Sequence, residues 1–239
     1  MTKDKLILAL DVAGAAEARE IVAELGGAVG AFKIGLQLFT AAGPDLVREL
    51  TRKGHRIFLD LKFHDIPNTV AKASVEAARL GVWMFNLHTL GGHEMMRQAA
   101  DEVSETCGRE NLAKPLIIGV TVLTSSDAGT LTEIGIERSV EDEVLALARL
   151  AEEAGLDGVV ASPIESHAVR RSKIGSAFLI VTPGVRPDSA TNDDQKRVTT
   201  PGAALSGGSD YIVVGRPILR AKNRSAAASA IVESMTSVV

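Results

Sequence analysis

The sequence predicts an α/β protein with a (β/α)8 TIM-barrel fold, formed as a single domain over residues 1–239. Eight short apolar, β-branched runs recur at steady spacing, and amphipathic segments rich in Ala, Glu and Arg separate them. Short strands of the buried type that alternate with helices are typical of βαβ units in a parallel sheet. Eight such units in 239 residues suit a closed barrel better than a doubly wound sheet, which is the alternative. No Pro/Ser-rich linker, low-complexity tract or change of composition divides the chain.

The expected elements follow one another in order. The strands are the runs LILAL (6–10), AFKI (31–34), IFL (57–59), WMFNL (83–87), LIIGVTVL (116–123), GVVA (158–161), FLIV (178–181) and YIVV (211–214). Helices are expected at residues 15–25, 44–53, 68–80, 93–105, 140–154 and 225–235, because these segments are amphipathic. Two connections are long, residues 124–139 and 183–201. Long connections in a compact domain are candidates for active-site lids.

Composition and charge exclude several classes of protein. Aromatic residues make up only 3%, which argues against base-stacking surfaces for single-stranded nucleic acid. The net charge of -4 gives no general basic field for nucleic acid or anionic lipid. The single cysteine, Cys107, excludes an internal disulfide and fits a reducing compartment. No apolar run reaches the length of a membrane span, and Asp11 interrupts the N-terminal apolar stretch too early for a signal peptide. We therefore expect a cytoplasmic protein that binds neither nucleic acid nor a membrane.

The most informative segment is DLKFHD at residues 60–65, directly after the third strand. It holds three charges of alternating sign: Asp60, Lys62 and Asp65. Residues two apart on a strand share a face, so Asp60 and Lys62 should project together. Asp65 should follow in a loop, before Pro67 opens a helix. Because buried charges are costly unless paired, we expect this set to be functional.

Polar residues also occur at the ends of the other expected strands. They are Asp11, Lys33, Asn86, His88, Thr121, Thr124, Ser162, Thr182 and Arg216. The carboxyl ends of the strands of a parallel barrel meet at one face, where active sites lie. Asp11 alone is explained equally well as a helix cap. Lys33 lies inside an apolar strand and therefore needs an acidic partner.

The eighth unit predicts an anion site. Gly215 allows a ligand to approach the backbone, Arg216 offers a bidentate guanidinium, and a helix begins at Pro217. The alternative is an ordinary turn with a surface arginine. In the long connection before it, Arg186 and Gln195 can donate hydrogen bonds to a phosphate; the alternative there is a solvated loop.

The sequence offers little for a metal or a nucleotide cofactor. None of the five histidines forms a His-x-x-x-His pair. His64 could join Asp60 and Asp65 around a cation, but Lys62 would repel it. His88 is expected to be a hydrogen-bonded wall residue. No P-loop, dinucleotide fingerprint or Gly-x-Ser-x-Gly elbow is present.

Residues 60–70, DLKFHDIPNTV, closely resemble the signature of the orotidine 5'-monophosphate decarboxylase family. Further blocks resemble this family in the same order: LALD (8–11), FKIG (32–35), VTVLTS (120–125), VTPGVRP (181–187) and VGRP (214–217). The resemblance covers essentially the whole chain.

The resemblance implies a TIM barrel that works as a homodimer without metal or organic cofactor. It implies conversion of orotidine 5'-monophosphate to UMP and CO2 in de novo pyrimidine biosynthesis. Lys33, Asp60, Lys62 and Asp65 match the family's charged tetrad. Lys62 would stabilise and protonate a C6 carbanion, and Asp60 would lie near the departing carboxylate. The remaining matches are Asp11 and Lys33 at the ribose, Thr124 at the pyrimidine, Arg186, Gln195, Gly215 and Arg216 at the phosphate, and Asp65 and Thr69 in the neighbouring subunit's site.

Two other functions are open at this point. Sugar-phosphate enzymes of the hexulose-6-phosphate synthase and keto-gulonate-6-phosphate decarboxylase type resemble the chain in Asp-x-Lys-x-x-Asp but use Mg2+. The resemblance implies that those enzymes carry an acidic residue at the position of Lys33. A lysine at this position opposes metal binding, so the metal-free function is favoured. The second is a catalytically silent barrel that only binds a phosphorylated nucleotide; the complete tetrad argues against it.

Overall fold

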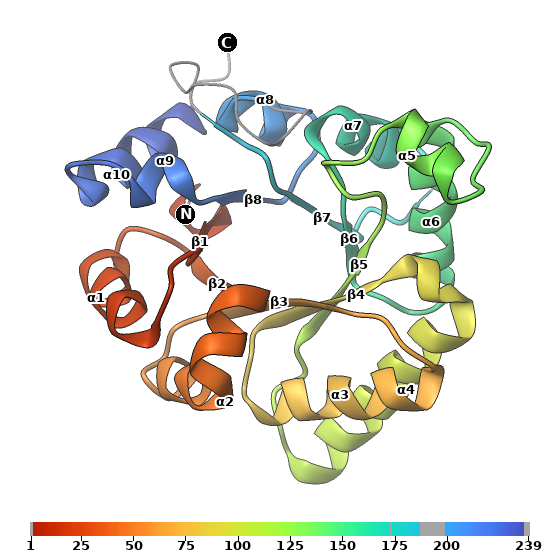
Figure 1. Ribbon diagram of the computed structural model, residues 1–239, viewed down its shortest axis with the longest axis horizontal. Coiled ribbons are helices and arrows are strands. Elements are labelled where there is room, and N and C mark those ends of the chain that lie inside the picture. The colour runs from red at the N-terminus through yellow and green to blue at the C-terminus, as the bar shows by residue number, and fades with distance from the viewer. Residues whose placement is uncertain (1, 173, 187–198, 237–239) are drawn as a thin grey trace.

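Eight parallel strands form a closed barrel in chain order in the computed structural model (Figure 1). The structure describes residues 2–172, 174–186 and 199–236. The closed barrel confirms the predicted (β/α)8 fold and excludes the open, doubly wound sheet. The strands are β1 (Leu6–Ala9), β2 (Ala31–Gly35), β3 (Ile57–Phe63), β4 (Met84–His88), β5 (Leu116–Val120), β6 (Gly158–Val160), β7 (Leu179–Thr182) and β8 (Tyr211–Val214).

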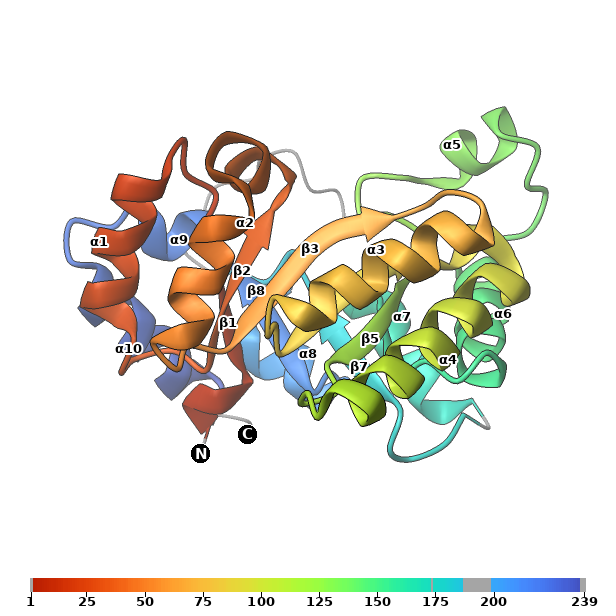
Figure 2. The same cartoon turned by 90° about the horizontal axis from the view of Figure 1, so that it is seen from below.

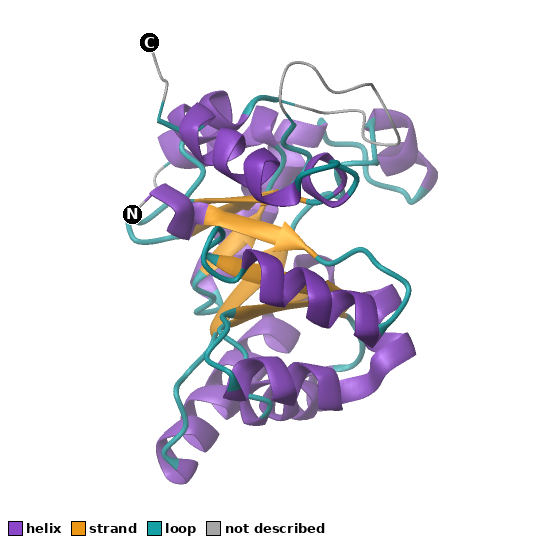
Figure 3. Ribbon diagram, turned by 90° about the vertical axis from the view of Figure 1, so that its left-hand side faces the viewer, coloured by secondary structure: helices purple, strands orange, loops and turns teal. Residues whose placement is uncertain are grey.

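Helices surround the barrel, as the side view in Figure 3 shows. They are α1 (Ala15–Leu25), α2 (Leu36–Arg52), α3 (Pro67–Arg79), α4 (Gly92–Glu110), α5 (Ala128–Glu133), α6 (Val140–Glu153), α7 (Pro163–Arg171), α8 (Pro201–Ser206), α9 (Arg216–Leu219) and α10 (Arg224–Ser234). Two short 3-10 helices, η1 (Thr2–Lys5) and η2 (Thr89–Gly91), complete the described elements. No helix in the described ranges is long and apolar enough to span a bilayer.

The strands bury side chains on both faces, which explains their nearly continuous apolar runs. Inward-facing residues such as Ile7, Phe58 and Ile118 pack in one small cluster inside the barrel. Outward-facing residues such as Leu8 and Phe85 belong to the larger cluster shared with the helices. The barrel interior is therefore a packed core, and space for a ligand remains at its end.

An aromatic cluster lies at the amino ends of the strands. The guanidinium carbon of Arg56 lies 3.7 Å from the centroid of the Trp83 ring. Trp83 and Tyr211 pack edge to face with their ring centroids 5.1 Å apart. These residues precede or begin β3, β4 and β8, so this end of the barrel is filled by side chains.

Several predicted boundaries differ from the structure. β3 continues to Phe63 instead of ending at Leu59, and β5 ends at Val120, before residue 123. The predicted helix 44–53 is the second part of α2, which begins at Leu36 and is kinked at Gly43, where φ is 67°. The connection 124–139 contains α5, which lies beyond the end of β5 in Figure 2. A single polar helical turn or two gives no clear apolar periodicity, and this is why α5 was not predicted.

Candidate active site

A cavity of about 300 Å³ lies at the carboxyl ends of the strands. It is lined by residues from all eight strands or from the connections that follow them. Charged and polar side chains from β1 to β4 form one side, and the connections after β5, β7 and β8 form the other. The strand-end residues are thus brought together from distant parts of the sequence, as the barrel prediction required.

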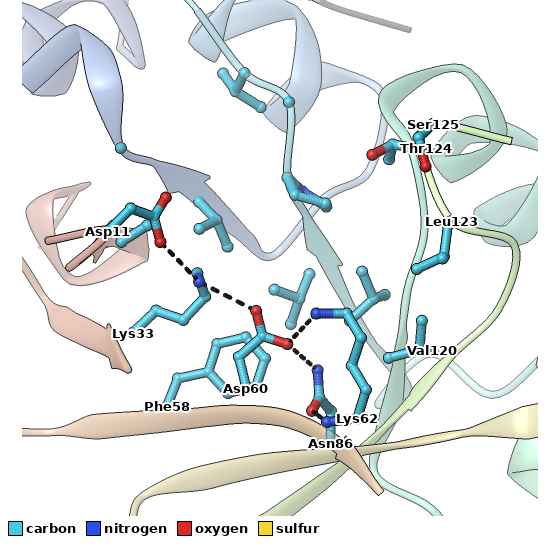
Figure 4. A pocket seen from close by; sticks show the side chains of 18 of the residues that line it. Asp11, Lys33, Phe58, Asp60, Lys62, Asn86, Val120, Leu123, Thr124 and Ser125 are labelled. Atoms are coloured by element: carbon cyan, nitrogen blue, oxygen red, sulfur yellow. Dashed lines mark hydrogen bonds and ion pairs between the residues drawn. The ribbon is translucent and has the colours of Figure 1, made fainter. Parts of the chain in front are cut away.

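Four charged side chains form a chain of alternating sign at the floor of this cavity (Figure 4). Lys33 Nζ lies 3.4 Å from Asp11 Oδ1 and 3.1 Å from Asp60 Oδ2. Lys62 Nζ lies 2.6 Å from Asp60 Oδ1. Lys33 therefore has the acidic partner that its place in an apolar strand required, and Asp60 holds one lysine on each carboxylate oxygen.

Burial and charge act in opposite directions on these groups. The side chains of Asp60 and Lys33 are only 13% and 12% exposed. Burial alone would raise the pKa of Asp60, but the ammonium groups of Lys33 and Lys62 outweigh it and lower this pKa from 3.8 to about 2. Burial alone would lower the pKa of Lys33, but Asp60 and Asp11 outweigh it and raise this pKa. Asp60 and Lys33 are consequently both charged at neutral pH.

Asp60 and Lys62 meet, but not through regular strand alternation. The pairing of β3 with β4 shifts register between Leu59 and Phe63. Lys62 has a φ of 53°, in the left-handed region that non-glycine residues seldom adopt. The prediction that the two side chains project together is confirmed, whereas the reason given for it was wrong: a local break in the strand directs Lys62 toward Asp60.

Asp65 does not join the charged side chains of the cavity in this structure. It is exposed, and its Oδ1 accepts a hydrogen bond of 2.7 Å from the backbone N–H of Ile66. Thr69 is also exposed, on the first turn of α3. Neither residue lines the cavity of its own chain. Their entry into a neighbouring subunit's site stays a prediction.

The opposite side of the cavity holds most of the predicted phosphate and pyrimidine residues. Thr124, Arg186, Gly215 and Arg216 all line it. A Cβ on Gly215 would lie 3.2 Å from Asp11 Oδ2 and 3.4 Å from Ala9 Cβ, so a side chain here would crowd the charged chain. Arg216 begins α9, as predicted for a helix following the eighth strand. Gln195 lies outside the described residues.

Four of the predicted strand-end residues do not line the cavity: Thr121, Ser162, Thr182 and His88, the last of which is described below. Thr121 Oγ1 donates a hydrogen bond to the carbonyl of Val160. Thr182 lies 3.1 Å from Ser166 Oγ, hydroxyl to hydroxyl, within a buried polar cluster. Ser162 is buried at the start of α7. These hydroxyl groups stand in the wall between strands and helices, because neighbouring positions at a strand end point to opposite faces.

His88 differs from its prediction as a hydrogen-bonded wall residue. Its Nδ1 is buried without a hydrogen-bond partner among the described residues. Its ring packs against that of His64, with centroids 5.5 Å apart. Burial, with the charges of His64 and Lys62, lowers the pKa of His88. Within the described ranges, His64 and the nearby carboxylates form no group of three metal-ligating side chains.

Asn86 was predicted to lie at a strand end but had no predicted role. Asn86 lines the cavity and contacts both Asp60 and Lys62. Its position on the strand next to the charged run 60–65 is the signal that could have identified it. Ser125 and Pro183 also line the cavity; both lie in segments that resembled the family, but neither was given a role. Phe58 lines the cavity too and carried no distinguishing signal in the sequence.

Comparison with known proteins gives consistent matches over the whole barrel. Residues 4–231 match the family model described as Orotidine 5'-phosphate decarboxylase / HUMPS family. The Orotidine 5'-phosphate decarboxylases of Syntrophotalea carbinolica and Pelobacter propionicus are 56% and 52% identical to this chain over 233 residues, which cover 98% of it and 95% of each relative. A crystal structure of Orotidine 5'-phosphate decarboxylase from Lactobacillus acidophilus superposes with a TM-score of 0.84 at 38% identity, covering 97% of this chain and 99% of that one.

Proposed function

Because the chain belongs to the Orotidine 5'-phosphate decarboxylase / HUMPS family, we propose that it converts orotidine 5'-monophosphate to UMP and CO2 in de novo pyrimidine synthesis. The observation that carries the proposal is the chain Asp11–Lys33–Asp60–Lys62 at the cavity floor. It places a fixed ammonium group in a partly desolvated site, where charge interactions are stronger than in water. Arginines line the other side of the same cavity.

Lys62 supplies the chemistry of the reacting carbon in this proposal. The bond between C6 and the carboxylate carbon breaks, its electron pair stays on C6, and CO2 leaves. The resulting sp2 carbanion lies in the plane of the ring, so the pyrimidine cannot readily delocalise it. An ammonium group held beside C6 stabilises this charge as it develops. A proton then moves from Lys62 Nζ to C6 and gives UMP.

Asp60 prepares Lys62 for this role. Its Oδ1 lies 2.6 Å from Lys62 Nζ, so the ammonium is held in place before the substrate arrives. The depressed pKa of Asp60, about 2, keeps the carboxylate charged at neutral pH. That charge orients both lysines and also stands near the position proposed for the substrate's own carboxylate. Repulsion there would raise the free energy of the bound substrate, and a fall in KM together with kcat in Asp60→Asn would indicate such strain.

The contacts with the phosphate, ribose and pyrimidine are proposed from the family resemblance, for residues most of which line the cavity. Arg186, Gly215 and Arg216 are proposed to bind the phosphate, together with Gln195, which lies outside the described residues. Asp11 and Lys33 would contact the ribose, and Thr124 the pyrimidine. Binding energy from the phosphate, remote from C6, then serves to position the reacting carbon against Lys62.

A homodimer is proposed to complete the site. Asp65 and Thr69 are exposed and do not line the cavity of their own chain, and Ile66 beside them is 66% exposed. The proposal of a second subunit rests on the match of Asp65 and Thr69 to the family's shared-site residues, because a single exposed apolar residue is common on protein surfaces. Asp65 would then supply the fourth charge of the tetrad to the partner's Lys62. A cytoplasmic location is also part of the proposal.

The Mg2+-dependent sugar-phosphate chemistry is disfavoured by Lys33. Its ammonium lies between the carboxylates of Asp11 and Asp60, within 3.4 Å of both. A divalent cation at these carboxylates would meet a positive charge where it needs a ligand. We therefore propose catalysis without metal or organic cofactor.

A spectrophotometric assay of orotidine 5'-monophosphate loss tests the proposal. The purified protein should consume the substrate with release of CO2, at the same rate with and without a chelator. Absence of turnover, with the nucleotide still bound, would support the catalytically silent barrel instead. Loss of activity in the chelator, restored by Mg2+, would support the metal-dependent chemistry.

A further inference from the structure

Asn86 connects two parts of the charged site. It lies on β4, next to β3, and only 1% of its surface is exposed. Its Nδ2 donates a hydrogen bond of 2.7 Å to Asp60 Oδ1. Its Oδ1 accepts a hydrogen bond of 2.8 Å from the backbone N–H of Lys62 (Figure 4). One buried amide thus contacts the side chain of one charged residue and the main chain of the other.

These contacts occur where β3 departs from regular pairing. Leu59 pairs with Phe85 and Phe63 pairs with Leu87, so β3 advances four residues while β4 advances two. Asn86 is the β4 residue inside this irregularity. The peptide N–H of Lys62 is therefore received by the Asn86 side chain. Such bulges re-aim side chains near active sites, and the φ of 53° at Lys62 is the local conformation that must be held.

Asp60 Oδ1 is a shared acceptor. It receives both the Asn86 amide and Lys62 Nζ, the latter at 2.6 Å. Moving Asn86 would therefore shift the carboxylate, the ammonium that it holds, and the backbone that carries this ammonium. Asparagine fits this position because it offers a donor and an acceptor at the end of a short side chain. An ionised aspartate lacks the donor and places a second negative charge beside Asp60, and leucine lacks both the donor and the acceptor.

We propose that Asn86 is a positioning residue, which fixes the bulge in β3 and thereby sets where the Lys62 ammonium meets the substrate. This proposal rests on the proposed decarboxylase function. Asn86 acts through Asp60 and Lys62, which act in the transition state. Phosphate binding across the cavity does not depend on it. Its loss should consequently lower kcat and leave binding of the product UMP almost unchanged.

The test compares Asn86→Leu and Asn86→Asp with wild type and with the control Thr89→Val. Thr89 Oγ1 donates a buried hydrogen bond to the carbonyl of Val120 just beyond β4, but Thr89 does not line the cavity. Both Asn86 variants should lose about 100-fold or more in kcat, as expected for a small misplacement of a catalytic group. Their affinity for UMP should stay within about threefold of wild type, since uniform binding is untouched. Thr89→Val should keep its kcat.

The pH profile supplies a readout that a general packing defect would not move. The Asn86 hydrogen bond helps to hold the pKa of Asp60 low, so its removal raises that pKa. The acidic limb of kcat in Asn86→Leu should therefore move to higher pH. Asn86→Asp, an isosteric change, keeps the test decisive if Asn86→Leu does not fold.

Two results would overturn the role of Asn86. One is a kcat within about threefold of wild type in either folded variant. The other is a loss of UMP affinity that parallels the loss of kcat, which would indicate a disordered cavity. Wild-type protein that fails to decarboxylate the substrate would instead overturn the proposed function itself, so the two failures are distinguishable.

Discussion

Replacing Asp60 by Asn removes the negative charge that two lysines share. The amide has nearly the shape of the carboxylate, so the change tests charge more than packing. Lys33 keeps Asp11 at 3.4 Å, whereas Lys62 loses the carboxylate it contacts at 2.6 Å. The two ammonium groups would then stand near each other with less compensation in a partly buried site.

The pKa of Asp60 gives the size of the effect on stability. Its depression from 3.8 to about 2 means that the folded protein favours the ionised carboxylate. At 1.36 kcal/mol per pKa unit, this contributes roughly 2 kcal/mol to the free energy of unfolding at neutral pH. A carboxyl group with a lowered folded-state pKa stabilises above its unfolded pKa and loses that contribution as pH falls through its folded pKa. About half of the contribution should remain at pH 3 and little below pH 2.

Urea unfolding of wild type and Asp60→Asn between pH 7 and pH 3 measures this difference. Wild type should be more stable by about 2 kcal/mol at pH 7, and the difference should shrink at pH 3. Asp101→Asn is the control, because Asp101 forms an ion pair with Arg97 on α4 but its side chain is 64% exposed. Its effect should be close to zero. Equal stability of wild type and Asp60→Asn at pH 7, or a difference that does not change with pH, would refute the proposed charge interaction.

Two further predictions concern the phosphate and the subunit contact. Arg216→Ala should raise KM for orotidine 5'-monophosphate about 100-fold or more, because a bidentate charge-assisted contact with the phosphate is lost. In the wild-type protein, added phosphite should partly restore turnover of the nucleoside that lacks the phosphate. If Arg216→Ala lowered turnover of the phosphate-free substrate by the same factor, the phosphate role would be contradicted. Asp65→Asn and Lys62→Ala proteins, each inactive alone, should regain part of the activity when mixed, because one site of the heterodimer then carries both native residues. Heterodimers demonstrated by mass spectrometry that show no activity would argue against shared sites.

The barrel was predictable because its signals are local and repeated. Each strand is a short apolar run in the sequence, and the closed order β1 to β8 follows from eight such units joined by helices. The sequence also predicted the strand-end position of Lys33 and its need for an acidic partner, and both Asp11 and Asp60 form ion pairs with Lys33. Alternation along a strand predicted that Asp60 and Lys62 lie together. The prediction is correct, but the contact arises from the bulge in β3 and not from alternation.

The remaining features depend on pairing between strands, which a single strand does not encode. The shift between Leu59 and Phe63 arises from how β3 meets β4, and it is this shift that gives Asn86 its contacts. The wall positions of Thr121 and Thr182 likewise depend on which face of the barrel each residue occupies at the end of its strand. The contact proposed for Asp65 cannot be predicted from the fold of a single chain, because its proposed partner belongs to another subunit.

The proposed mechanism depends most on the Lys62 ammonium as the group that would stabilise and protonate the C6 carbanion. The direct measurement is the turnover number of Lys62→Ala with orotidine 5'-monophosphate, together with its affinity for UMP. Lys114→Ala, an exposed lysine before β5, provides the control. Lys62→Ala should show no measurable turnover while UMP affinity stays within about tenfold of wild type. Turnover by Lys62→Ala within about tenfold of wild type would contradict the mechanism.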